Sequence, residues 1–164
     1  MDAVYFIFDA VLTFAVYAFM LRLLLQLVRA DFRNPLSQAI IALTSWLVVP
    51  LRRVLPPIGR LDTASVVALL LVQFAAIAIL IKLRYGTLFP LGAMAVGTLQ
   101  ALAVGAILLY TVMIFVGALL SFFAPAPFTP ATQILDSLCE PVLRPIRALV
   151  PVVGGLDFSP LIAL

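Results

Sequence analysis

Three long apolar stretches dominate the chain, and each is long enough to cross a membrane. A crossing helix needs about 20 residues at a rise of about 1.5 Å per residue. The stretches predict spanning helices at roughly residues 5–28, 63–81 and 102–123. No charge occurs from Leu91 to Ala124, so residues 91–101 are expected to extend the third helix. Arg22 lies near the end of the first stretch, where its side chain is expected to reach the lipid headgroups.

Two shorter segments have the pattern of amphipathic helices. Each begins with a capping residue followed by proline, at Asn34-Pro35 and Thr129-Pro130, and the first helical turn does not need the proline N–H. The expected helices cover about residues 35–48 and 130–140. They are too short to cross a membrane and suit its interface, where Trp46 would also fit.

A segment rich in proline and glycine follows each amphipathic helix, from Pro50 to Asp62 and from Pro145 to Asp157. These residues disfavour a regular spanning helix. The segments are apolar, so each is expected to lie in the interface or to re-enter the membrane shallowly. Asp62 is the expected N-cap of the second span. A last span is expected from about residue 158, and the sequence stops before it can cross, which favours truncation.

The two halves of this pattern are copies of one another. Moving on by 95 residues from Pro35–Asp62, without a gap, gives nine identities in 28 positions. The identical pairs are Pro35/Pro130, Gln38/Gln133, Leu43/Leu138, Pro50/Pro145, Arg52/Arg147, Pro56/Pro151, Gly59/Gly154, Leu61/Leu156 and Asp62/Asp157. Such a repeat decides the architecture. The predicted fold is an all-α integral membrane protein of two tandem parallel repeats, residues 1–84 and 102–164, joined by a connector at 85–101.

Composition agrees with a membrane protein. The chain is 65% hydrophobic and 10% charged, with a mean hydropathy of +1.27, whereas about a quarter of the residues of a soluble domain are charged. Most basic residues lie beside the repeated segments, and only Lys82 and Arg84 lie on the other side. The positive-inside rule therefore predicts cytoplasmic repeated segments and an external amino terminus.

Several kinds of chemistry are excluded by residue usage. Histidine is absent, which excludes the usual triads, zinc sites and bis-histidine haem. Cys139 is the only cysteine, so the chain has no intrachain disulfide and no paired-cysteine redox motif. No catalytic, cofactor-binding or metal-binding residue is predicted, and no nucleic-acid-binding platform is present. An enzyme is therefore not expected.

The repeated charges form the clearest candidate site. Arg52, Asp62, Arg147 and Asp157 hold the same places in both copies, and an ion near lipid is costly unless it is paired. The favoured interpretation is structural, with each pair tying a loop to the next helix. In the alternative, Arg52 and Arg147 hold an anion or a lipid phosphate, which suits the shape of guanidinium.

A stripe of small residues marks the helix that follows the connector. Ala93, Gly97, Ala101 and Gly105 recur every four residues, which allows close helix approach in lipid. Packing within the chain is favoured over a homo-oligomer face. Asp9, early in the first span, is expected at the interface, with a proton or cation site as the alternative.

The arrangement of these motifs resembles the YggT (YlmG) family of small bacterial and plastid membrane proteins. The matching residues are Asn34-Pro35, Pro50, Arg52, Pro56, Gly59 and Asp62 in the first copy, and Pro130, Glu140-Pro141, Arg144-Pro145, Arg147, Pro151, Gly154 and Asp157 in the second. Thr129 replaces the asparagine in the second copy. The resemblance implies a multi-pass protein of the bacterial inner membrane, linked to osmotic stress, to cell division or, in plastids, to cytochrome haem assembly. Direct haem binding is not expected, because it would need Cys139, a methionine or a tyrosine.

The favoured function is therefore a non-enzymatic envelope scaffold or stress-related factor. A small channel or transporter lined by the two repeated loops is one alternative, and an assembly factor for a membrane cofactor protein is another. The expected partners are membrane lipids, including anionic ones, a second copy of the chain, or an unidentified membrane protein.

Overall fold

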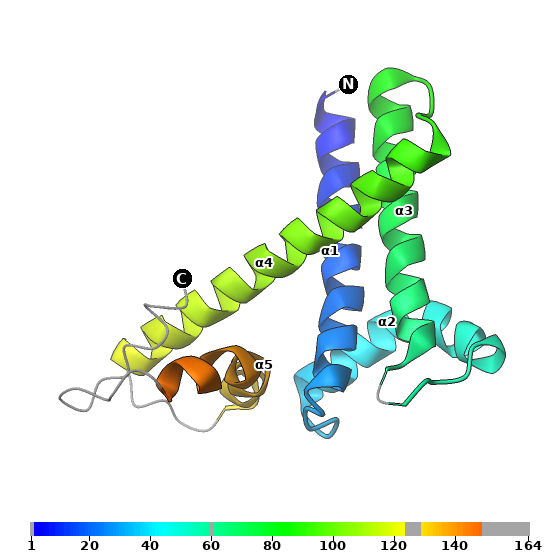
Figure 1. Cartoon of the computed structure of the whole chain (residues 1–164). Helices are drawn as coiled ribbons and strands as arrows, with labels where there is room; N and C mark the ends of the chain where they lie inside the picture. Colours follow the sequence, from blue (N-terminus) through cyan, green and yellow to red (C-terminus); the bar gives the residue numbers. More distant parts are fainter. Residues whose placement is uncertain (1, 60, 124–128, 149–164) are drawn as a thin grey trace. The chain divides into compact units, whose positions relative to one another are not determined.

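The computed structural model describes residues 2–59, 61–123 and 129–148, and that part of the chain forms five α-helices (Figure 1). They are α1 (Asp2–Leu27), α2 (Pro35–Val54), α3 (Thr63–Tyr85), α4 (Leu91–Phe123) and α5 (Pro130–Arg147). The all-α fold is as predicted. Four of these helices contain segments long and apolar enough to cross a membrane, namely Ala3–Leu27, Pro35–Val54, Thr63–Tyr85 and Leu91–Leu120.

The amphipathic helices are longer than the sequence predicted. α2 continues through Pro50 to Val54, and α5 continues through Pro141 and Pro145 to Arg147. A proline inside a helix removes one backbone hydrogen bond and costs about 3 kcal/mol. In α2 this cost is opposed by contacts on both sides of Pro50, because Val48 is fully buried and Arg52 forms an ion pair.

The extension of α2 leaves only a short connection between Val54 and Thr63. Ile58 and Leu61 exchange two backbone hydrogen bonds of 3.1 Å, and Gly59 has a φ of +61°, which favours glycine. The hydroxyl of Thr63 donates to the carbonyl of Pro56 at 2.7 Å and closes this turn. The corresponding loop of the second copy, and the last span expected from residue 158, lie outside the described residues.

The chain divides into two compact units. Unit 1 comprises Met1–Leu23 and Ile40–Ala106, and unit 2 comprises Leu24–Ala39 and Ile107–Leu164. The boundaries fall inside α1, α2 and α4, so each of these helices contributes to both units.

In unit 1, α1 and α3 run side by side in opposite directions (Figure 1). At one end, the guanidinium of Arg84 lies 5.5 Å from the ring centre of Tyr5. At the other end, the charge of Asp62 acts on Arg22. Small side chains line the buried face of α3, including Ala64 and Ala68, and small residues let membrane helices approach closely. The residues of α2 in this unit lie across the second end (Figure 1).

In unit 2, the described connections are held by helix caps. α1 ends in a Schellman motif, in which the N–H of Ala30 donates to the carbonyl of Leu25 and Arg29 adopts a φ of +54°. Asn34 caps α2, because its Oδ1 accepts from the N–H of Leu36 at 2.9 Å. Thr129 caps α5 in a reciprocal arrangement with Thr132. Both predicted helix starts are confirmed.

Candidate functional site

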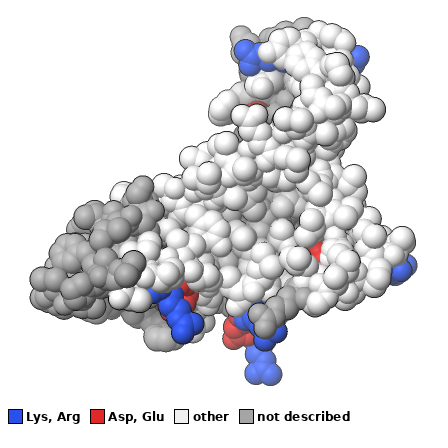
Figure 2. Space-filling model, viewed as in Figure 1, with Lys and Arg blue, Asp and Glu red and all other residues white. Residues whose placement is uncertain are grey.

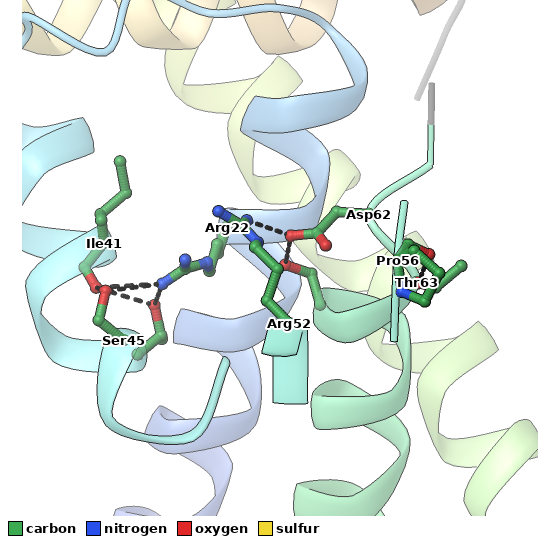
Figure 3. Close-up of polar contacts among 9 residues, drawn as sticks. Arg22, Ile41, Ser45, Arg52, Pro56, Asp62 and Thr63 are labelled. Atoms are coloured by element: carbon green, nitrogen blue, oxygen red, sulfur yellow. Dashed lines mark hydrogen bonds and ion pairs between the residues drawn. The ribbon is translucent and has the colours of Figure 1, made fainter. Parts of the chain in front are cut away.

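The centre of the candidate site is Arg22, on α1 in unit 1. Its side chain is buried, with only 6% of the residue exposed. Nη1 donates three hydrogen bonds to α2, to the carbonyl of Ile41 at 3.1 Å, to Oγ1 of Thr44 at 2.8 Å and to Oγ of Ser45 at 3.1 Å (Figure 3). Its Nη1 is satisfied by α2, which offers polar acceptors at that level. That Arg22 reaches the level of the lipid headgroups stays a prediction.

The local structure of α2 explains why these acceptors are available. The hydroxyls of Thr44 and Ser45 donate their hydrogens to carbonyls one turn earlier, at Ile40 and Ile41. Serine and threonine inside a helix commonly bond in this way. Their oxygen lone pairs then remain free to accept from Arg22, so three oxygens of one helix face converge on a single guanidinium nitrogen.

A second polar group joins the end of α2 to the start of α3. Nη2 of Arg52 forms an ion pair with Oδ2 of Asp62, and the hydroxyl of Ser65 donates to the same oxygen at 2.7 Å (Figure 3). The Asp62 side chain is 1% exposed and the Arg52 side chain is 46% exposed. Asp62 occupies the predicted N-cap position of α3, but its carboxylate makes no cap hydrogen bond to the backbone. Arg52 and Ser65 bind the oxygen Oδ2 instead.

The two groups are electrostatically coupled. The charges of Arg52 and Asp62 both act on the Arg22 guanidinium, the first unfavourably and the second favourably. Two cations therefore share one carboxylate, and the three residues together carry a net charge of +1. α2 is attached to α1 through Arg22 and to α3 through Arg52. Among the described residues, no group of three or more carboxylate or cysteine side chains could hold a metal ion.

The second pair of repeated charges, Arg147 and Asp157, lies outside the described side chains. Arg147 is the last residue of α5, but its side chain lies outside the described part, as does Asp157. Of the four charges predicted from the repeat, the structure therefore describes the side chains of Arg52 and Asp62.

The small-residue stripe of α4 lies partly against neighbouring helices of unit 1. A Cβ at Gly97 would lie 3.9 Å from the side chain of Ile77 on α3, and one at Gly105 would lie 3.5 Å from Met20 on α1. Ala93 is exposed and Ala101 is half-buried. Gly97 and Gly105 thus have neighbours within the chain.

Sequence reasoning missed Arg22, Thr44, Ser45 and Ser65 as parts of one polar cluster. One signal was available, because an arginine within a spanning stretch needs partners, and adjacent hydroxyls on the next amphipathic helix can supply them. The repeat indicated other residues, namely the arginines and aspartates that recur after 95 positions. Neither Arg22 nor the two hydroxyls of α2 are among its identical positions.

Comparison with known proteins gives the family. The family model described as CCB3/YggT matches residues 1–83 and 96–164. An uncharacterized protein of Pseudomonas aeruginosa is 37% identical over 145 residues, which cover 88% of this chain and 74% of that protein. The uncharacterized protein YggT of Escherichia coli K12 is 34% identical over 162 residues, covering 99% and 84%. An uncharacterized protein of Haemophilus influenzae is 31% identical over 144 residues, covering 88% and 76%.

No solved structure matches the chain significantly. The family resemblance predicted from the motifs is confirmed, because the family model covers nearly the whole sequence and relatives above 30% identity extend along most of it. The chain is a multi-pass membrane protein that belongs to the CCB3/YggT family.

Proposed function

We propose that this protein is a non-enzymatic scaffold of the bacterial inner membrane. In this proposal α1, α3 and α4 cross the membrane, whereas α2 and α5 lie in its cytoplasmic interface as platforms for lipids and for other membrane proteins. The observation that carries the proposal is the attachment of α2 to one common end of α1 and α3.

The contacts of α2 support an interfacial position. Arg22 bonds to Thr44 near the middle of α2, and Arg52, eight residues later, pairs with Asp62 at the start of α3. A helix that crossed the membrane would carry Arg52 about 12 Å deeper than Thr44. Both contacts instead lie at the end of unit 1 opposite the Arg84–Tyr5 contact. A helix lying across that end accounts for both.

The distribution of charge supports the proposed orientation. On the face drawn in Figure 2, most of the surface is free of charged side chains. The end of unit 1 that contains Arg22 also carries Arg52 and Arg53, and the end with Arg84 carries Lys82. With the additional arginines between the first two spans, the positive-inside rule puts the α2 end in the cytoplasm and the amino terminus outside.

The proposal includes two tandem repeats, residues 1–84 and 102–164. The two stretches matched by the family model begin at residues 1 and 96, and 96 − 1 is the 95-residue offset of the sequence repeat. α2 and α5 begin at Pro35 and Pro130, with the same offset. The helix starts also meet, because Nδ2 of Asn34 donates to the carbonyl of Pro130 at 2.7 Å. Contact between equivalent helix starts is expected near an axis that relates two copies.

A scaffold, unlike a channel, does not need a path for solutes through the membrane. A channel or transporter needs a polar path through the membrane, whereas the described hydrogen bonds and the ion pair between side chains of different helices in unit 1 gather at one end. A scaffold can use such a cluster to fix a platform. The proposed partners are acidic lipids, a second copy of the chain or another membrane protein, and the proposed role lies in envelope organisation under osmotic stress or during division.

Two measurements on the full chain in liposomes test the proposal. Spin labels placed singly at Leu43, Trp46 and Val49, with Cys139 replaced by serine, should report shallow depths for α2. A label at Ala76 inside α3 provides the deep reference. Efflux of small ions and of a neutral osmolyte should be the same with and without protein. Labels spread across the full membrane depth would overturn the interfacial position, and protein-dependent efflux would favour the channel.

An assembly role would show a different result. A deletion strain grown in high osmolarity should be rescued by the wild-type chain and poorly by R22Q if the platform supports envelope organisation. Loss of a single membrane cofactor protein, with normal growth in high osmolarity, would favour the assembly factor.

A further inference from the structure

The hydrogen bonds of Arg22 all go to neutral oxygens. Its three hydrogen bonds all come from Nη1, and their acceptors are one carbonyl and two hydroxyls. Within the described part of the chain, Nη2 and Nε have no hydrogen-bond partner. The nearby carboxylate of Asp62 is already bonded to Arg52 and Ser65. A buried cation in these surroundings has no full counter-charge of its own.

The charge of the whole cluster has the same sign. Arg22 and Arg52 contribute +2 and Asp62 contributes −1, so the cluster carries a net +1. A charge withdrawn from water is costly unless an opposite charge lies near it. At the level of a membrane interface, the abundant anion is the phosphate of a lipid headgroup. The chemistry of the cluster therefore favours a negatively charged headgroup over a neutral one.

Arg52 connects the buried cluster with the surface. Its side chain is 46% exposed although it is paired with the buried Asp62. About one turn before and one turn after it on the same side, Val49 is 45% exposed and Leu55 is half-buried. A lipid lying here would meet a cation at its headgroup and apolar side chains beside its acyl chains.

We propose that the α2 end of unit 1 binds one acidic phospholipid, with its phosphate on Arg52 and with the buried charge of Arg22 favouring a net negative headgroup. The inference rests on the proposed interfacial position of α2 and adds the lipid class and the residues that select it. Guanidinium suits this task, because its planar N–H groups can bind two phosphate oxygens at once.

The test is a titration of the purified full chain in detergent with phosphatidylglycerol, read as the rise in unfolding temperature and as bound lipid in native mass spectrometry. Phosphatidylcholine and inorganic phosphate are the comparison ligands. R52Q should weaken phosphatidylglycerol binding about fivefold, the size expected for one basic residue near a lipid surface. R53Q is the matched control, since Arg53 is exposed and points about 100° around the helix. It should bind within about twofold of the wild type.

Two further variants separate charge from fold. D62N removes the only carboxylate of the cluster and should tighten binding, whereas R22K keeps the charge of Arg22 and should retain the preference for phosphatidylglycerol. Equal losses in R52Q and R53Q, or equal binding of phosphatidylcholine, would overturn the inference. An equal effect of inorganic phosphate would also overturn it, because the site would then take a free anion. If spin labels remain shallow while lipid preference is absent, the lipid site fails and the interfacial platform stands.

Discussion

The helix pair α1–α2 is joined by hydrogen bonds, whereas the pair α4–α5 is joined by close packing. In the first, Arg22 of α1 reaches three oxygens on α2 and holds the helices with a long, charged side chain. The residue 95 positions later is Gly117 on α4, which has no side chain at all. There a Cβ would lie only 2.7 Å from Cδ2 of Leu135 on α5. A polar bridge in one pair thus corresponds to direct contact in the other.

The helices α2 and α5 also differ at the positions that correspond to the acceptors of Arg22. Thr44 and Ser45, which accept from Arg22, correspond to Cys139 and Glu140 on α5. Cys139 is buried and Glu140 is exposed, so α5 keeps an apolar face toward the protein and a charged face away from it. In the sequence alignment of the two copies, the hydrogen bonds of Arg22 to α2 therefore correspond to close packing of Gly117 against Leu135.

The largest expected effect follows from removing the polar bridge. R22A takes away three charge-assisted hydrogen bonds between α1 and α2 and should lower the free energy of unfolding by about 2–3 kcal/mol. The measurement is unfolding of the full chain in mild detergent with added sodium dodecyl sulfate, followed by circular dichroism. Q26A, one turn further along α1, is the control and should change stability by less than about 0.5 kcal/mol. Equal effects of R22A and Q26A would show that the bridge does not hold α2.

The next effect concerns the asymmetry of the Arg52–Asp62 pair. R52Q should cost about 2 kcal/mol, because it removes the ion-paired guanidinium from the buried carboxylate of Asp62. D62N should cost only about 1 kcal/mol, because the half-exposed Arg52 can be hydrated again. The same unfolding assay compares the two variants with R53Q as the unaffected reference. A larger loss in D62N than in R52Q would show that the environments of the two charges are reversed.

The sequence predicted the framework better than the site. Spans are set by apolar length, so α1 and α3 lie within a few residues of their expected places, and capping fixed the starts at Pro35 and Pro130. The predicted ends of α2 and α5 were wrong because proline locally favours a helix stop, whereas contacts such as the Arg52–Asp62 pair carry α2 past Pro50. Such contacts depend on tertiary position, which local sequence does not contain.

The sequence predicted only part of the site. Arg52 and Asp62 were found because they recur after 95 residues, and a repeated charge is visible without a structure. Arg22 does not recur, and its partners are 19 to 23 residues away on another helix. A search for repeated residues therefore selects what the two copies share and overlooks the interaction that distinguishes them.

A third prediction addresses the contact between the equivalent helix starts. N34A should cost about 1–2 kcal/mol, because it removes both the cap of α2 and the bond to the carbonyl of Pro130. N34D keeps an oxygen for the N–H of Leu36 but loses the donor, so its stability should fall between N34A and the wild type. T129A, which removes only a cap, should cost about 1 kcal/mol. If N34D equals the wild type, the bond to Pro130 contributes nothing measurable.

The smallest effects test the direct contact of α4 with α5. G117A adds a Cβ that must displace Leu135, a flexible side chain, so the strain should be limited to about 1 kcal/mol. G97A, on the same helix, adds a Cβ at an ordinary 3.9 Å from Ile77 and should be neutral or stabilising, since alanine favours a helix by up to about 1 kcal/mol over glycine. L135A should remove most of the cost of G117A in the double variant, as measured by a double-mutant cycle. If G117A is at least as stable as G97A, α4 and α5 are not in tight contact, and the contrast with the Arg22 bridge would then rest on the first copy alone.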